Sequence, residues 1–139
     1  MSSTFVLVHG AFGGPYGFRS VRRLLNAQGH EAITPSLTGI GERRHLANPD
    51  IGLSLHIEDL TNAIEMDDLH DIVLLGFSYG GMVISGVMDA VADRVSHVVF
   101  LDAFVPSDGD SAASLSGAGG AAMAASAVDG YVAPIPRDL

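Results

Sequence analysis

The stretch that decides the fold is Asp71-Ile72-Val73-Leu74-Leu75-Gly76-Phe77-Ser78-Tyr79-Gly80-Gly81-Met82. Four consecutive branched apolar residues between polar and glycine boundaries are typical of a strand buried on both faces of a parallel sheet. The Gly-x-Ser-x-Gly that follows must reverse the chain within a few residues, and glycines at 76 and 80 remove the Cβ atoms that would collide there. We therefore expect Ser78 in a strained conformation with its hydroxyl exposed as a nucleophile. The structural alternative is a tight turn whose serine only caps the next helix.

Composition bounds the class of protein. A chain of 139 residues has room for one domain, and 47% hydrophobic residues without a long apolar run indicate a soluble globular protein. The N-terminus has no basic region before its short apolar stretch, so a cytoplasmic location is the default expectation. No cysteine and no lysine occur, which excludes thiolate metal sites and Schiff-base chemistry within the chain. A net charge of −9 argues against nucleic acid and anionic membrane surfaces as partners.

The rest of the chain alternates strand and helix patterns. Further strands are expected at Phe5–Val8, at Glu31–Thr34 before Pro35, and at 97–101. Helical spacing links Phe18, Val21, Leu24 and Leu25, then Ile57, Leu60 and Ile64 with Ser54 as a cap, and a third helix is expected over 82–91. Right-handed crossovers turn this order into an α/β fold, a parallel sheet with helices on both faces.

Three polar residues follow predicted strands. His9, Ser78 and Asp102 each lie at or just past a carboxyl end, where ligands bind in sheets of this kind. The composition changes from Ser107 onward, so we divide the chain into residues 1–106, the core, and residues 107–139. Alanine, serine and glycine dominate 111–127, which is typical either of a flexible linker or of the start of a lid over the site.

Three segments carry a resemblance to a known family: Val6-Leu7-Val8-His9-Gly10-Ala11, Gly76-Phe77-Ser78-Tyr79-Gly80-Gly81 and Leu101-Asp102-Ala103-Phe104-Val105-Pro106. They resemble the N-terminal part of the α/β-hydrolase superfamily, in particular its compact branch of plant methyl esterases, hydroxynitrile lyases and related bacterial esterases. The resemblance implies an oxyanion hole formed by the backbone N–H groups of Ala11 and Tyr79. Gly10 and Phe12, on the same loop, are then expected to contact substrate.

A serine nucleophile needs a base, and the sequence offers none in the expected place. In the family the catalytic histidine comes after the acid, which would fall beyond residue 139. His30, His70 and His97 precede or begin strands, His9 is expected to shape its loop, and His45 and His56 are expected to be solvated or structural. Asp102 is the acid candidate, although the compact branch more often places the acid one strand later.

The resulting hypothesis is a serine hydrolase that cleaves small or medium carboxylic esters through an acyl-enzyme on Ser78, without metal or cofactor. The base is expected from a C-terminal remainder, either a second chain or a continuation, with Leu139 near a break in the lid region. This segment alone is then expected to be inactive. A hydroxynitrile lyase, a non-catalytic binding protein and an inactive fragment of the fold are the alternatives. Dehalogenases and epoxide hydrolases of this fold place aspartate at the elbow, so Ser78 argues against them.

Overall fold

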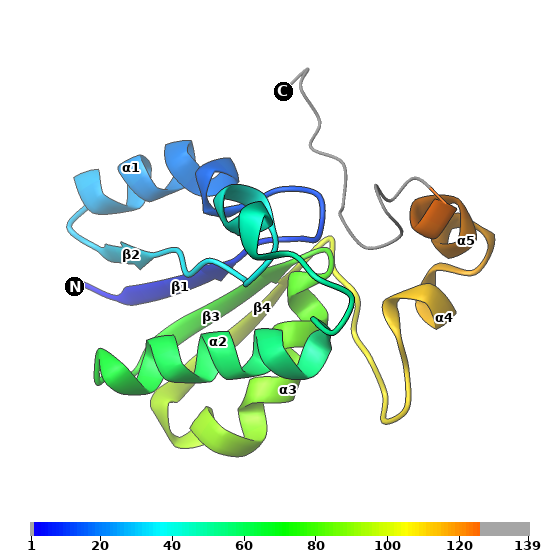
Figure 1. Cartoon of the computed structure of the whole chain (residues 1–139). Helices are drawn as coiled ribbons and strands as arrows, with labels where there is room; N and C mark the ends of the chain where they lie inside the picture. Colours follow the sequence, from blue (N-terminus) through cyan, green and yellow to red (C-terminus); the bar gives the residue numbers. More distant parts are fainter. Residues whose placement is uncertain (1, 126–139) are drawn as a thin grey trace.

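A computed structural model describes residues 2–125 of the chain (Figure 1). Its elements follow in the order β1 (Thr4–Val8), the 3-10 helix η1 (Pro15–Phe18), α1 (Arg19–Ala27), β2 (Glu31–Ile33), η2 (Gly41–Leu46), α2 (Leu53–Met66), β3 (Ile72–Phe77), α3 (Gly80–Val91), η3 (Ala92–Arg94), β4 (Val95–Leu101), α4 (Ala112–Ser116) and α5 (Ala118–Ala125).

The four strands form one parallel sheet in the order β2-β1-β3-β4. Helix α1 covers one face of the sheet, while α2 and α3 cover the other (Figure 1). The predicted fold class is therefore confirmed. The chain leaves β1 toward β2 and leaves β3 toward β4, so the connections diverge between the two central strands. Such a switch point opens a crevice at the carboxyl ends of those strands.

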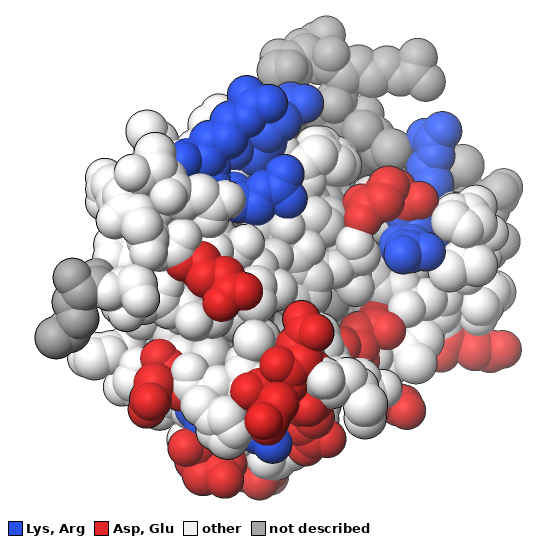
Figure 2. All heavy atoms as spheres, turned by 90° about the vertical axis from the view of Figure 1, so that its left-hand side faces the viewer, with Lys and Arg blue, Asp and Glu red and all other residues white. Residues whose placement is uncertain are grey.

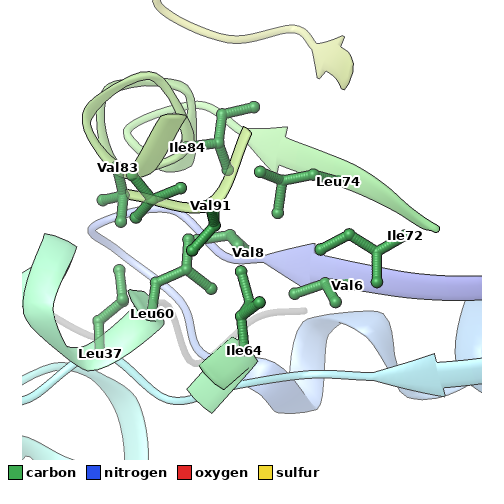
Figure 3. Close-up of a cluster of buried hydrophobic side chains, with 11 residues drawn as sticks. Val6, Val8, Leu37, Leu60, Ile64, Ile72, Leu74, Val83, Ile84 and Val91 are labelled. Atoms are coloured by element: carbon green, nitrogen blue, oxygen red, sulfur yellow. The ribbon is translucent and has the colours of Figure 1, made fainter. Parts of the chain in front are cut away.

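The core lies between the sheet and the helix pair α2 and α3 (Figure 3). Alternate residues of β1 and β3 point into it, because successive strand residues face opposite sides of a sheet. Its fully buried members are Val6, Val8, Leu37, Leu60, Ile64, Ile72, Leu74, Val83, Ile84, Val87 and Val91. This packing fixes the two strands that carry the candidate site.

One predicted helix cap was wrong, and another helix begins earlier than its apolar pattern indicates. Helix α2 begins at Leu53 with Gly52 as its cap, so Ser54 lies inside the first turn and caps nothing. The extended backbone of Gly52 allows its carbonyl to accept the first helical hydrogen bond, from the N–H of His56, at 3.3 Å. Helix α3 begins at Gly80, two residues before the predicted Met82. Helix propensity disfavours glycine, but close packing at residues 80 and 81 outweighs that preference.

Strand β4 is the outer strand on its side of the described sheet. Its apolar residues Val98, Val99, Phe100 and Leu101 are 37–49% exposed, on both faces of the sheet. Within residues 2–125, β4 pairs only with β3. Long apolar edge strands of this kind are ready templates for pairing with further polypeptide.

Charged side chains are abundant at the amino ends of the strands. Figure 2 views this side, and shows arginine atoms gathered above and acidic side chains spread below. Here Arg94 donates to Asp68 at 3.1 Å, and His70 lies 3.0 Å from the same carboxylate. The ionic network is exposed and lies at the opposite edge from Ser78, so it does not belong to the candidate site. None of the described helices combines the length and the apolar character needed to cross a bilayer.

The described part of 107–139 contains α4 and α5, which lie to the right of the sheet in Figure 1. Ser111 and Ser114 form a reciprocal capping box that begins α4. The two interpretations of this region, as a lid or as a linker, stay predictions. The division of the chain at residue 106 also stays a prediction. The predicted break at Leu139 lies outside the described residues.

Candidate functional site

The turn between β3 and α3 holds Ser78 in the left-handed region, with φ of +54°. The glycines around it allow backbone segments to approach closely. A Cβ added at Gly76 would lie 2.6 Å from the carbonyl oxygen of Gly80. A Cβ at Gly80 would collide with the Val8 carbonyl, and one at Gly81 with the Phe104 carbonyl. The Ser78 turn is thus wedged between the end of β1 and the segment after β4.

The loop after β1 passes directly over the serine. Gly10 is buried, and a Cβ added there would lie 3.1 Å from the Cβ of Ser78 and 3.5 Å from its Oγ. Only a glycine leaves the loop this close without displacing Ser78. The backbone of residues 10 and 11 is therefore a near neighbour of the hydroxyl.

Hydrogen bonds orient the two peptide groups predicted to form the oxyanion hole. The Gly10 carbonyl, which shares a peptide group with the Ala11 N–H, lies 2.8 Å from Nδ1 of His9. The Ser78 carbonyl, paired in the same way with the Tyr79 N–H, accepts from the N–H groups of Gly81 and Phe104 at 3.0 and 3.2 Å. Both peptides are trans, so each N–H points away from its carbonyl. Among the described residues, neither N–H donates to a protein acceptor.

His9 is a structural histidine with a defined tautomer. It is 2% exposed, and its Nε2 accepts from the backbone N–H of Leu37 at 3.1 Å. Nε2 is therefore unprotonated, and Nδ1 carries the proton that it donates to the Gly10 carbonyl. Burial lowers the pKa of His9, which keeps the ring neutral. With both nitrogens engaged, His9 shapes its loop, as predicted, and is not available as a base.

This buried neutral ring makes stability depend on pH. The folded-state pKa of His9 lies below its unfolded value of about 6.5, so its contribution is complete above that pH. As the pH falls below about 6.5, the unfolded chain takes up a proton that folded His9 does not. We expect the free energy of unfolding to fall by up to about 1.4 kcal/mol per pH unit from this residue.

Urea unfolding of the His9→Gln variant between pH 5 and 8 measures this effect. The variant should be less stable throughout and should show a shallower dependence on pH, whereas the exposed-site control His45→Gln should keep the original slope. An unchanged slope in His9→Gln would contradict a neutral buried His9.

All six histidines lie within the described residues, and none hydrogen-bonds to Ser78. His30 accepts from the N–H of Ser3 at 3.0 Å, while His70 and His97 bind their neighbours Asp68 and Ser96. His45 is exposed in η2. His56, expected to be solvated or structural, takes the structural alternative: it is buried, and its Nδ1 lies 2.7 Å from the Tyr79 hydroxyl. Its spacing of four from Leu60 and eight from Ile64 was the sequence signal for burial, because all three lie on one helical stripe.

A cavity of about 530 Å³ adjoins Ser78. Gly10, Ala11 and Phe12 of the β1 loop line it, together with Phe77 at the turn. Its remaining lining residues come from the β1 loop, η1, α1 and β4: His9, Gly13, Gly14, Tyr16, Gly17, Phe18, Val21 and Leu101. Aromatic and aliphatic side chains and glycine backbone predominate, so the cavity suits an apolar group rather than a charged one.

Asp102 follows β4 at the same edge of the sheet. Phe77 and Leu101 are register partners, so Ser78 and Asp102 leave neighbouring strands at the same level. Asp102 has φ of +47° and an exposed side chain, and its carboxylate has no hydrogen-bond partner among the described residues. The structure therefore brings together Ser78, Gly10, Ala11, Phe12 and Tyr79 and leaves Asp102 open at the rim. No three metal-ligating side chains converge within the described part of the chain.

Comparison with known proteins gives consistent matches. Residues 5–138 match the sequence model described as the alpha/beta hydrolase family. The carbendazim hydrolyzing esterase of Nocardioides sp. (strain SG-4G) is 47% identical over 109 residues, covering 78% of this chain and 45% of that protein. Methylesterase 2 of Arabidopsis thaliana is 34% identical over 106 residues, covering 73% of this chain and 40% of that protein.

Among solved structures, an extracellular alpha/beta-hydrolase from a Paenibacillus species superposes with a TM-score of 0.74 at 36% identity. It is described as sharing structural and functional homology with Tobacco Salicylic Acid Binding Protein 2. The superposition covers 80% of this chain and 45% of that one. The chain thus spans under half of the length of these relatives.

Proposed function

Because the chain belongs to the alpha/beta hydrolase family, we propose that it carries the nucleophile and oxyanion hole of a serine esterase for small or medium apolar carboxylic esters. The observation that carries the proposal is the position of Ser78. Its left-handed backbone holds the hydroxyl beside the Gly10 backbone and at the wall of the 530 Å³ cavity. The esterase names of the relatives support the same reaction class.

In the proposed reaction, Ser78 Oγ attacks the ester carbonyl carbon and the carbonyl oxygen becomes an oxyanion. The N–H groups of Ala11 and Tyr79 donate to this oxyanion, and each such donor typically contributes about 3 kcal/mol to transition-state stabilisation. The C–O bond to the alcohol then breaks, which leaves an acyl group on Ser78. Water attacks the acyl carbon, releases the acid and restores the serine.

The binding roles follow from the cavity. Gly10 provides the close backbone approach over the scissile bond, and Phe12 contributes part of the apolar wall. These features suit an acyl or alcohol group without charge. No step in this reaction calls for a metal ion or cofactor.

The base must take the Ser78 proton and return it to the leaving alcohol. Both nitrogens of His9 and of His56 are already engaged, so we propose that the imidazole comes from polypeptide outside residues 1–139. Asp102, open at the rim beside the turn, is the carboxylate proposed to orient it. The exposed β4 edge is where that polypeptide would extend the sheet.

The test is active-site labelling with a fluorophosphonate, followed by peptide mass spectrometry and a chromogenic acetate ester assay. The complete protein should be labelled at Ser78 and should hydrolyse the ester, whereas the 139-residue chain alone should do neither at a comparable rate. Labelling at another residue would refute the proposal. Cyanide release from a cyanohydrin without ester turnover would indicate the lyase instead. Absence of both reactions would favour a binding protein.

The partner proposal has its own measurement. Size-exclusion chromatography with intact-mass analysis should find the active species larger than the 14.4 kDa chain. An active monomer of that mass would contradict a base supplied from outside.

A further inference from the structure

His56 lies on α2 and contacts Tyr79, the residue that follows Ser78. It is 5% exposed, and its Nδ1 lies 2.7 Å from the Tyr79 hydroxyl. Its Nε2 lies 2.8 Å from the carbonyl oxygen of Thr38. The two rings also meet edge to face, with centroids 5.6 Å apart. The reaction proposed above does not use this buried imidazole.

The partners determine which way each hydrogen bond runs. A carbonyl oxygen can only accept, so Nε2 of His56 carries the proton and donates to Thr38. In the neutral imidazole Nδ1 is then the acceptor, and the Tyr79 hydroxyl donates to it. Burial raises the pKa of Tyr79 to about 12, so the phenol keeps the proton that it donates.

Thr38 is itself held by α2. Asp59 accepts from the Thr38 N–H at 2.7 Å and from its hydroxyl at 2.8 Å. His56 and Asp59 are three residues apart and therefore project from the same side of the helix. Together they engage the N–H, hydroxyl and carbonyl groups of Thr38, which fixes the carbonyl that anchors His56.

Tyr79 packs against the hydrophobic core and also borders open space. A second cavity, of about 150 Å³, is lined by Tyr79, His56, Thr38 and Ala11 among others. It leaves space beside the phenol into which the ring could tilt. The hydrogen bond to His56 opposes this movement at the far end of the side chain.

We propose that His56 is a positioning residue for ester hydrolysis: by holding the Tyr79 hydroxyl, it fixes the direction in which the Tyr79 backbone N–H faces the substrate. This inference rests on the proposed serine esterase function. The Tyr79 N–H belongs to the peptide group that follows Ser78, so tethering the far end of the side chain restricts rotation of that peptide. His9 orients the Ala11 peptide directly. The Tyr79 peptide is held at the Ser78 carbonyl by two backbone N–H groups, and His56 adds a restraint through the Tyr79 side chain.

Two substitutions separate the two hydrogen bonds of His56. Asparagine places an acceptor oxygen close to the position of Nδ1, and glutamine places a donor close to the position of Nε2. His56→Asn therefore keeps the bond from Tyr79, while His56→Gln keeps the bond to Thr38. Tyr79→Phe removes the hydroxyl alone, and His45→Gln is the matched control at an exposed histidine.

In the complete protein we expect Tyr79→Phe and His56→Gln to lower kcat about tenfold with KM within twofold, since loss of a whole donor costs roughly 10²–10³-fold. His56→Asn should keep most of kcat. The double variant Tyr79→Phe/His56→Gln should be no slower than either single variant, because both remove the same contact. Unchanged kcat in Tyr79→Phe, or an equal loss in all three single variants, would overturn the proposal.

A second readout does not depend on activity. In ¹H–¹⁵N NMR spectra of the chain, the Tyr79 amide signal should move or broaden in His56→Gln and stay in place in His56→Asn and His45→Gln. An unmoved signal in His56→Gln would refute positioning even if catalysis fails. Ester turnover that survives Ser78→Ala would refute the proposed function instead, and the NMR comparison would still decide the role of His56.

Discussion

Replacing Ser78 with alanine is expected to lower ester turnover of the complete protein by on the order of 10⁴-fold or more, the loss seen when a serine nucleophile is removed. The proposed acyl-enzyme cannot form without Oγ. Alanine tolerates φ of +54° no better and no worse than serine, so the free energy of unfolding should change by less than about 0.5 kcal/mol. The measurements are steady-state kinetics with a chromogenic ester and urea unfolding of the same preparations.

Ser96→Ala is the matched control, because Ser96 lies on β4 near its amino end and remote from the cavity. It should keep full turnover. If Ser78→Ala lost much less than about 10⁴-fold of its ester turnover, Ser78 would not be the nucleophile.

Replacing Gly81 with alanine is expected to destabilise the fold by roughly 3 kcal/mol or more, and to abolish labelling of Ser78. The new Cβ would overlap the Phe104 carbonyl, a backbone atom that cannot rotate away. The segment after β4 would have to move, and with it the Phe104 N–H that binds the Ser78 carbonyl. Helix propensity alone predicts the opposite sign, a gain of about 1 kcal/mol for alanine within α3.

Gly52→Ala is the control for this substitution, since a Cβ at Gly52 meets open space and its backbone is extended. Alanine is a poorer N-cap than glycine, so the free energy of unfolding should fall by no more than about 1 kcal/mol, well below the loss expected for Gly81→Ala. Urea unfolding distinguishes the two variants, and a stabilised Gly81→Ala protein would show that the post-β4 segment is not packed as described.

Local sequence patterns predicted the strands and the sharp turn well. Branched residues before Gly76 and the glycines around Ser78 are short-range signals, and the structure contains the strand, the turn and the parallel sheet that they implied. The prediction that Ser54 caps α2 was wrong, because serine is only one of several residues that can precede a helix. Gly52 fills that position here.

The role of His56 could not be read from the chain. Its partner Tyr79 is 23 residues away, and the pairing depends on how α2 packs beside the Ser78 turn. Spacing indicates that His56 is buried, but not which polar group satisfies it. The same holds for Asp102, because its proposed role as the acid depends on an imidazole that none of the six described histidines supplies near Ser78.

Besides the hydrogen bond between Tyr79 and His56, the Ser78 turn is joined to its surroundings through backbone atoms: glycine contacts with β1 and a hydrogen bond from Phe104. Rotation of a side chain cannot release these backbone contacts. Amide protons at the turn should therefore exchange with solvent only when the central strands also separate. On heating, the reactivity of Ser78 and the tertiary structure should then be lost in one cooperative transition rather than in two.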